Sequence, residues 1–238
     1  MNVALVTASG VGSRVGHQIP KQFLSVNDKM IIVYTLESLQ RNDNIDKIIV
    51  ACLDGWEKIL ASHVKQFNLT KVEWIVKGGD SGQESITNCL EELKPHISDD
   101  DLVIIHDGNR PLVSDFIVNE SVRICKKHGN AVASIPVVEA VLEILDKSSN
   151  PISGLAFDRD QMVRTQTPHT FKFGDIYRSY EEIKNKNSEA VAPCTVMVEL
   201  GRKVYFSPGS ELNFKITTRD DLEIFKALIS YKGADYEV

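Results

Sequence analysis

A glycine-rich segment with two basic residues follows the first apolar run of the chain. This run, "NVALV", leads directly into "TASGVGSRVGHQIPKQF", residues 7–23. Gly10 and Gly12 permit positive φ angles and a close approach of the backbone to a ligand. Backbone N–H groups in such loops bind anions, and Arg14 and Lys21 add positive charge on the same segment. The segment is therefore predicted to hold the phosphate groups of a nucleotide.

A dinucleotide redox cofactor is the first alternative, because the glycines form a GxGxxxG pattern. The dinucleotide fingerprint requires a helix that begins inside the glycine cluster, and Pro20 would end such a helix after about two turns. The acidic residue expected about 20 residues further on, at the end of a second strand, is missing, since the next strand begins only at Ile45. An open loop that carries Arg14 and Lys21 suits a nucleoside triphosphate better.

Two further segments resemble strand ends that carry ligand-binding groups. In "KGGDSGQES" (77–85), paired glycines permit tight backbone contact with a base or ribose. In "IIHDGNRP" (104–111), Asp107 ends an apolar strand, and a carboxylate there suits Mg²⁺. Arg110 can hold a phosphate or brace the loop. His106 is expected to be structural, because no second histidine stands at metal-ligand spacing.

A third segment, "NFKITTRDDL" (213–222), places Lys215 just before a helix with a capping box at its start. On sequence alone, a single lysine in this position indicates no more than a solvated surface group. The residue types by themselves therefore do not select Lys215 as functional.

Apolar runs alternate with helical patterns along most of the chain. Strands are expected at 2–6, 45–52, 71–76, 101–107, 131–137 and 203–208, and helices at 31–41, 56–67, 84–94, 114–128 and 219–231. Ser114 is the expected N-cap of its helix and Gly129 its stop. This alternation predicts an α/β fold, with a mostly parallel sheet covered by helices on both faces. Ligands of such sheets bind at the carboxyl ends of the strands.

Residues 138–164 break the alternation and read as a hairpin, with its turn at Ser148–Pro151. A long hairpin outside the main layers is typical of a dimer arm. We therefore expect a single domain over 1–238, in which 136–164 form a dimerisation arm of a homodimer.

The composition is that of an ordinary soluble protein. The chain has 238 residues, 42% of them hydrophobic, and a net charge of −6, which argues against a nucleic-acid-binding surface. Its four cysteines lie far apart without metal-ligand spacing, which favours reduced thiols. With no signal peptide and no apolar run long enough to span a membrane, a cytoplasmic enzyme is expected.

Six motifs in order resemble one enzyme family. They are "LVTASGVGSR" (5–14), "PKQ" (20–22), "GGD…S" (78–85), "HDGNRP" (106–111), "DR…TP" (158–168) and "NFKITT" (213–218). The resemblance is to the cytidylyltransferases that act on sugar-alcohol phosphates, the methylerythritol-phosphate and ribitol-phosphate enzymes. It implies a Rossmann-like three-layer nucleotidyltransferase fold with a protruding β-arm. It also implies transfer of CMP from CTP to a polyol phosphate, release of pyrophosphate, and Mg²⁺ as the divalent cation.

The same resemblance implies the roles of the site residues on the nucleotide side. Arg14 and Lys21 would contact the CTP phosphates, and Lys215 would stabilise the pentacoordinate phosphorus together with Lys21. The residues implied for the nucleoside are Ala8, Ser9, Gly10, Gly12, Gly79, Asp80 and Ser85.

On the acceptor side, the resemblance implies that Asp107 serves the metal and the acceptor, with Arg110 nearby. Arg159 and Thr167 would hold the acceptor phosphate. Because the family's arm crosses to a neighbouring subunit, Arg159 would act in trans in a homodimer.

Several positions depart from the family pattern. Gly82 stands where an arginine is usual, and Val191–Cys194 replace an acidic stretch; Ser9 and Val15 are milder changes. The strings "PVVEAV" and "QTPHTF" look more like the ribitol-phosphate branch. A ribitol 5-phosphate-like acceptor is therefore the leading hypothesis. The alternatives are 2-C-methyl-D-erythritol 4-phosphate as acceptor, or a diverged CTP-binding protein with little turnover.

Overall fold

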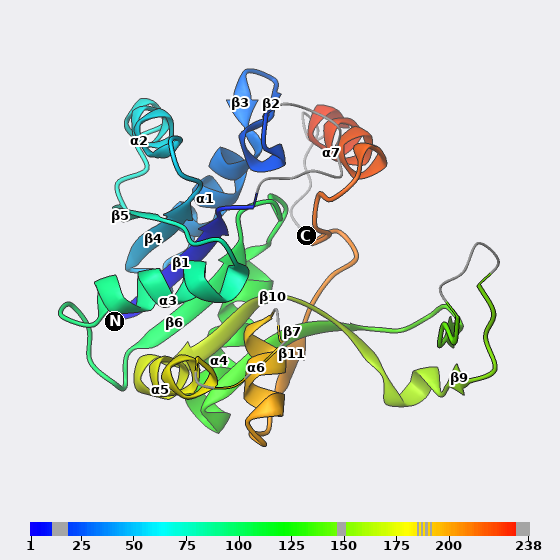
Figure 1. Cartoon of the computed structure of the whole chain (residues 1–238). Helices are drawn as coiled ribbons and strands as arrows, with labels where there is room; N and C mark the ends of the chain where they lie inside the picture. Colours follow the sequence, from blue (N-terminus) through cyan, green and yellow to red (C-terminus); the bar gives the residue numbers. More distant parts are fainter. Residues whose placement is uncertain are drawn as a thin grey trace.

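The centre of the molecule is a twisted seven-stranded sheet (Figure 1). The computed structural model describes residues 1–10, 19–146, 151–184, 186, 188, 190 and 192–231. In chain order the strands of this sheet are β1 (Asn2–Ala8), β4 (Lys47–Cys52), β5 (Val72–Lys77), β6 (Leu102–Asp107), β7 (Asn130–Pro136), β10 (Val163–Lys172) and β11 (Phe206–Pro208). Their spatial order is β11-β7-β10-β6-β1-β4-β5. Only β10 runs antiparallel to its neighbours, so the predicted mostly parallel sheet is confirmed.

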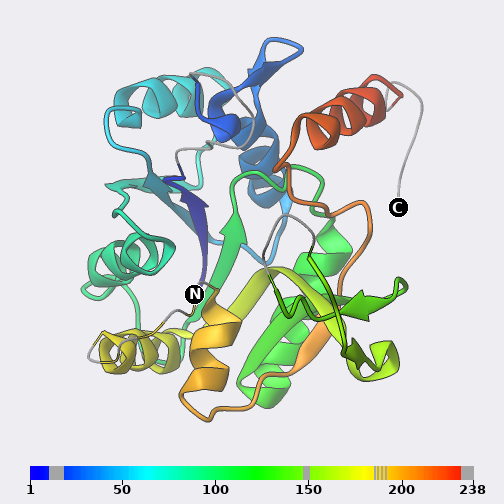
Figure 2. The same ribbon diagram turned by 45° about the vertical axis from the view of Figure 1, so that its right-hand side comes forward.

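Helices cover both faces of the sheet, as Figures 1 and 2 show. The helices on one face are α1 (Ile31–Arg41), α2 (Glu57–Gln66) and α4 (Asp115–His128), and those on the other are α3 (Gly82–Leu93), α5 (Phe173–Ile183) and α6 (Pro193–Glu199). Strand β1 shows why both layers form. Its alternate side chains enter opposite cores, with Ala4 and Val6 in the first and Val3 and Leu5 in the second. The expected three-layer α/β fold is therefore confirmed.

A smaller apolar cluster holds the C-terminal helix α7 (Arg219–Tyr231) against the short hairpin of β2 (Ser25–Val26) and β3 (Lys29–Met30) and the start of α1. Phe225 is fully buried in this cluster beside Ile216. The predicted capping box is present, because Thr218 Oγ1 accepts from Asp221 N–H and Asp221 Oδ2 accepts from Thr218 N–H. This packing fixes Ile216, the residue after Lys215.

The helix boundaries expected for α4 are also confirmed. The Ser114 hydroxyl accepts from the Ile117 N–H at 3.4 Å, and Gly129 ends the helix in the left-handed region at φ 93°. Such boundaries are readable from sequence because a specific side chain or a missing side chain produces each of them.

Strand β10 and helices α5 and α6 were not expected from the sequence, and neither was the short hairpin of β2 and β3. Strand β10 is polar along its length and contains Pro168, yet its second half is buried because it fills the gap between β6 and β7. Helix α6 is short and begins with Pro193. Helix α5 follows β10 directly. Neither the polar strand nor the short helix carries a clear apolar period, so the apolar pattern does not predict them. Helix α5 does bury apolar residues at helical spacing, among them Phe173, Ile176, Tyr180 and Ile183, so its absence from the predicted helices is an error.

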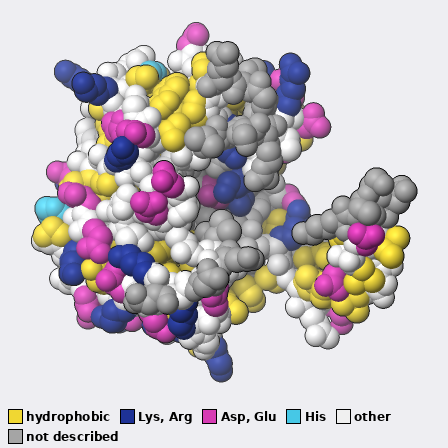
Figure 3. All heavy atoms as spheres, in the orientation of Figure 1, with side chains coloured by type: hydrophobic (Ala, Val, Ile, Leu, Met, Phe, Trp, Pro, Cys, Tyr) yellow, Lys and Arg dark blue, Asp and Glu magenta, His cyan; other side chains and the backbone are white. Residues whose placement is uncertain are grey.

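The predicted hairpin projects from the body as an arm (Figure 1). Strands β8 (Val141–Leu142) and β9 (Ala156–Phe157) pair antiparallel within it, and the arm joins the end of β7 to the start of β10. Of the expected turn, residues 148–150 lie outside the described residues. Hydrophobic side chains gather on the arm (Figure 3), including Val138, Leu142, Ile144, Leu145, Ile152, Leu155 and Phe157, which are 44% to 62% exposed.

Within the described residues, no helix is long and apolar enough to cross a lipid bilayer.

We expect Phe225→Ala to lower the free energy of unfolding by about 3–5 kcal/mol, because it empties a buried aromatic site in the α7 cluster. The matched control is Ile224→Ala, at the half-exposed neighbouring position, which should stay within about 0.5 kcal/mol of the wild type. Urea denaturation measures both. Equal losses in the two variants would contradict the packing described for α7.

Candidate active site

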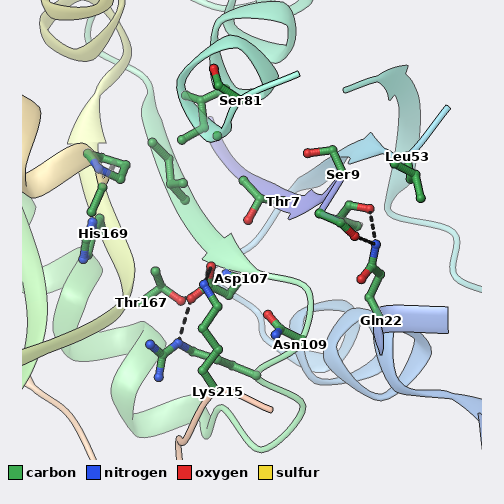
Figure 4. Close-up of a pocket in the computed structure, with 18 of the residues that line it drawn as sticks. Thr7, Ser9, Gln22, Leu53, Ser81, Asp107, Asn109, Thr167, His169 and Lys215 are labelled. Carbon is green, nitrogen blue, oxygen red and sulfur yellow. Dashed lines mark hydrogen bonds and ion pairs between the residues drawn. The ribbon is translucent and has the colours of Figure 1, made fainter. Parts of the chain in front are cut away.

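A cavity of about 520 Å³ lies at the carboxyl edge of the sheet, where an α/β fold is expected to bind its ligand (Figure 4). Six regions far apart in sequence line it: the end of β1, Leu53 after β4, the β5–α3 loop, the end of β6, the middle of β10 and the start of α6. Lys21 and Lys215 contribute from two further segments. In the part of the chain that the structure describes, the charged groups of the lining are three cations and two carboxylates, namely Lys21, Arg110, Lys215, Asp80 and Asp107.

The start of the predicted nucleotide loop is held by Gln22. Its side chain is buried, and its Nε2 donates to the carbonyl oxygens of Ala8 at 2.8 Å and Gly10 at 2.9 Å (Figure 4). Lys21, beside it in the short 3₁₀ turn Lys21–Phe23, lines the cavity. The other predicted residues of this loop, Gly12 and Arg14, lie outside the described residues.

The β5–α3 loop packs against the end of β1 through a glycine. A Cβ on Gly78 would lie 2.2 Å from the Ser9 Cβ, so no other residue fits there without a shift. The Ser85 hydroxyl donates to the Ser81 carbonyl, accepts from the Gly79 N–H and bonds the Ser9 hydroxyl at 2.7 Å. Ser85 is fully buried and joins the two loops instead of lining the cavity. Its expected direct contact with a nucleoside is therefore revised to a supporting role.

The N-terminus of α3 faces the same cavity. Ser81 caps it by accepting from the Glu84 N–H at 3.0 Å, and Gly79, Asp80 and Gly82 line the wall. A helix N-terminus presents backbone N–H groups and a partial positive charge to an anion. At Gly82, where the family pattern has an arginine, this chain presents only backbone atoms to the cavity and lacks the positive charge of that side chain.

Asp107 joins two cations at the floor of the cavity. Its Oδ1 accepts from Lys215 Nζ at 2.8 Å and its Oδ2 from Arg110 Nε at 2.9 Å. Burial alone would raise the pKa of Asp107, but the charges of Lys215 and Arg110 outweigh it and hold that pKa below its usual range. The three groups therefore keep one net positive charge in front of a ligand.

These ion pairs bear on the metal that the sequence predicts at Asp107. Both carboxylate oxygens already bind cations, and the described residues contain no cluster of three or more potential metal ligands. The site thus fits a Mg²⁺ that arrives with substrate phosphates, as this ion often does. It does not fit a cage of protein carboxylates.

Hydrogen bonds fasten the segment of Lys215 to the loop after β6. Asn109 Nδ2 donates to the Ile216 carbonyl at 2.6 Å, and the Ile216 N–H donates back to the Asn109 carbonyl at 2.9 Å. Arg110 Nη1 donates to the Asn213 carbonyl at 2.8 Å. The structure thereby brings together two motifs that are about a hundred residues apart. Lys215 is held in an ion pair at the cavity, and is not the solvated surface group that the sequence alone would indicate.

The hydrogen-bond partners of Thr167 decide what its hydroxyl offers a ligand. Its Oγ1 accepts from the Asp107 N–H at 3.0 Å and bonds His106 Nδ1 at 3.0 Å. His106 Nε2 faces the Arg110 carbonyl at 3.2 Å, so that nitrogen carries the proton. Burial lowers the pKa of His106 to about 4, so the ring is neutral near pH 7 and Nδ1 accepts the Thr167 proton. Thr167 therefore presents an acceptor lone pair, which suits a hydroxyl donor better than the acceptor phosphate predicted for it. Its contact with the acceptor stays a prediction.

Among the described residues, Arg159 is, with Ser85, a predicted site residue that does not line the cavity of its own chain. It lies on the arm, and its Nη1 donates to the Val138 carbonyl at 2.8 Å. Conversely, the lining includes residues that the sequence analysis did not select, among them Gln166, His169 and Pro193. These belong to β10 and α6, the elements without a clear apolar period. The string "QTPHTF" and the departure at Val191–Cys194 include them, but neither signal assigned them to the site.

The parallel-sheet fold and the cationic cavity at its carboxyl edge define a nucleotidyltransferase-like α/β protein. The family model described as "IspD: 2-C-methyl-D-erythritol 4-phosphate cytidylyltransferase" matches residues 2–230, and the chain belongs to this family.

Individual relatives fall into two groups by name. A ribitol-5-phosphate cytidylyltransferase of Lacticaseibacillus paracasei is 40% identical over 98% of this chain and 99% of its own. A 2-C-methyl-D-erythritol 4-phosphate cytidylyltransferase of Clostridium beijerinckii is 37% identical over 92% of this chain and 94% of its own. Among solved structures, the 2-C-methyl-D-erythritol 4-phosphate cytidylyltransferase of Francisella tularensis superposes with a TM-score of 0.79 at 26% identity, covering 95% of this chain and 98% of that one.

We expect stability to fall on acidification, in part through the buried histidines His106 and His169. Burial lowers the pKa of each to about 4, against about 6.5 in an unfolded chain. Between these values the unfolded state binds more protons, so the free energy of unfolding decreases as the pH falls from about 6.5 to about 4. In His169→Gln the free energy of unfolding should depend less steeply on pH, because up to one proton fewer is taken up on unfolding. Urea unfolding between pH 4 and pH 6.5 measures this slope. Parallel curves for variant and wild type would contradict a buried, neutral His169.

Proposed function

We propose that the protein transfers CMP from CTP to ribitol 5-phosphate and releases pyrophosphate. The observation that carries this proposal is the convergence of Lys21, Arg110 and Lys215 on one cavity beside Ser9 and Gly10, the described start of the glycine-rich segment. Membership of a cytidylyltransferase family supports the nucleotide, and the 40% identical relative named for ribitol 5-phosphate supports the acceptor.

The chemistry is an in-line displacement at phosphorus. An oxygen of the acceptor phosphate forms a bond to the α-phosphorus of CTP, the bond from that phosphorus to the bridging oxygen breaks, and pyrophosphate leaves with the electron pair. Negative charge increases around the phosphorus as this happens, and fixed cations in a cavity stabilise it. Lys21 and Lys215 are proposed for this role with Arg14. Mg²⁺ supplies further charge neutralisation on the triphosphate.

The two substrates divide the cavity between them. We assign the nucleoside to the wall formed by Ala8, Ser9, Gly10, Gly79 and Asp80. The nucleoside contact predicted for Gly12 belongs to the same proposal, although this residue lies outside the described part of the chain. The acceptor then lies on the side of Asp107, Arg110 and Thr167. Asp107 orients Lys215 toward the phosphates through their ion pair, while the Thr167 lone pair accepts from an acceptor hydroxyl.

The arm supports a homodimer in which each site receives Arg159 from the neighbouring chain. Seven hydrophobic side chains of the arm are 44% to 62% exposed, more apolar surface than a hairpin of a monomer usually presents to water. Arg159 lies among them and outside the cavity of its own chain. Its guanidinium in trans would hold the acceptor phosphate in a bidentate manner.

An acceptor panel tests the function and separates it from its alternatives. The protein is incubated with CTP, Mg²⁺ and either ribitol 5-phosphate or 2-C-methyl-D-erythritol 4-phosphate, and released pyrophosphate is measured. Higher kcat/KM with ribitol 5-phosphate supports the proposal. Preference for the second acceptor would assign the methylerythritol reaction instead, while CTP binding without pyrophosphate release from either would indicate a binding protein.

We expect Lys21→Ala and Lys215→Ala each to lower kcat/KM by about 10²-fold, the scale of a lost transition-state charge contact. The matched control is Lys58→Ala, an exposed lysine of α2, which should retain wild-type activity. Pyrophosphate release under saturating CTP measures the effect. Wild-type rates in both site variants would contradict the proposed charge stabilisation.

We expect subunit mixing to restore activity if Arg159 acts across the dimer. Arg159→Ala and Lys215→Ala proteins should each be nearly inactive alone. After denaturation and refolding together, mixed dimers contain one site with both native residues, so roughly a quarter of wild-type activity should return. A mixture that stays inactive although mixed dimers form would contradict the trans arrangement.

A further inference from the structure

His169 on β10 is a buried side chain without hydrogen-bond partners. It is 2% exposed, and neither Nδ1 nor Nε2 bonds any described residue. The backbone of Gln166 acts on the pKa of the ring as a hydrogen-bonding neighbour, but no contact of normal hydrogen-bond distance and angle joins it to either ring nitrogen. His106, on the adjacent strand, differs sharply, because both of its ring nitrogens are engaged.

Such a group costs stability, since a buried donor or acceptor that lacks a partner pays its full desolvation penalty. An apolar residue of the same shape would avoid this penalty. The position of His169 indicates why the cost is tolerated, because the residue is one of those that line the cavity of the proposed active site. A ligand in that cavity supplies the missing partner.

The place of His169 along the cavity identifies the substrate it meets. In Figure 4 it lies on one side of Asp107, Thr167 and Lys215, and the nucleotide wall with Ser9 and Gln22 lies on the other. Phosphoryl transfer is proposed at the cations in between. Whatever extends beyond them toward His169 therefore belongs to the acceptor.

The chemistry of the ring narrows the choice to one kind of group. Burial keeps the imidazole neutral near pH 7, so it offers one N–H donor and one acceptor nitrogen. A hydroxyl matches this pair, whereas a phosphate dianion is better bound by cations. Ile105, which pairs with His169 in the register of β6 and β10, is apolar. Ala192 and Pro193 are further uncharged residues of the lining.

We propose that His169 hydrogen-bonds a hydroxyl of the acceptor's polyol chain and thereby selects acceptors that carry it. The assignment rests on the proposed function and deepens it. Rotation about χ2, a broad torsion in histidine, turns a ring nitrogen to the ligand. Thr167, two residues earlier on the same strand, accepts from the acceptor as well, so β10 reads the polyol chain through two side chains.

The test compares ribitol 5-phosphate with its single-deoxy analogues in the wild type, His169→Phe and His169→Gln, with CTP and Mg²⁺. One deoxy analogue should lower the wild-type kcat/KM by about 10-fold or more, because it leaves a buried polar group unpaired. His169→Phe should lose a similar factor with ribitol 5-phosphate, stop discriminating against that analogue and keep its KM for CTP within about twofold. His169→Gln, which retains a donor and an acceptor, should recover part of the discrimination.

The controls separate this assignment from the function on which it rests. His128→Gln, at an exposed position on α4, should behave as the wild type. If His169→Phe does not fold, the test rests on His169→Gln. Its ratio of kcat/KM values for ribitol 5-phosphate and the deoxy analogue should then differ from the wild-type ratio. Undiminished discrimination in a folded variant overturns the role of His169 and leaves the function intact. A wild type inactive with CTP and ribitol 5-phosphate overturns the proposed function and this assignment with it.

Discussion

The pairing of Asp107 with Lys215 and Arg110 is the interaction on which the site depends. It joins a strand end near the middle of the sequence to a segment more than a hundred residues later, in a place where each charge would be costly if it stood alone. The carboxylate compensates most of the repulsion between the two cations, yet the group as a whole stays positive. A cavity prepared in this way attracts phosphates without requiring a net basic protein, which agrees with an overall charge of −6.

Several polar groups around the cavity are already committed to one another. The Ser85 hydroxyl forms hydrogen bonds with three neighbours, and the Gln22 side chain donates to two backbone carbonyls. The Thr167 hydroxyl donates a hydrogen bond to His106 Nδ1. These contacts remove the freedom of the loops before a ligand arrives, so less conformational entropy remains to be lost on binding. The same bookkeeping of donors and acceptors makes His169 conspicuous, since it alone among the described ring and hydroxyl groups of the cavity lining is both buried and without a partner.

Sequence patterns were sufficient for the parts of the fold whose cause is local. Helix α4 followed from Ser114 and Gly129, and the carboxyl edge of the sheet followed from β–α alternation. Strand β10 did not follow, because its burial comes from its neighbours β6 and β7 and not from its own polar residues. The site divides in the same way: Lys21 and Asp107 were indicated by their place after strands, whereas Lys215 entered only through family resemblance. Gln22 and His169 needed the three-dimensional contacts, because their roles depend on partners, or on the lack of partners, elsewhere in the chain.

The central position of β10 has a consequence for the order in which the chain is assembled. Strands β6 and β7 are both complete by residue 136, but they are not adjacent in the sheet, and the strand between them arrives only after the arm. During synthesis each of them therefore keeps a row of backbone groups without a sheet partner until residue 172 has left the ribosome. Closing this gap is a long-range event, and such contacts form late. The arm is thus also the connection whose length influences how quickly β10 pairs between β6 and β7.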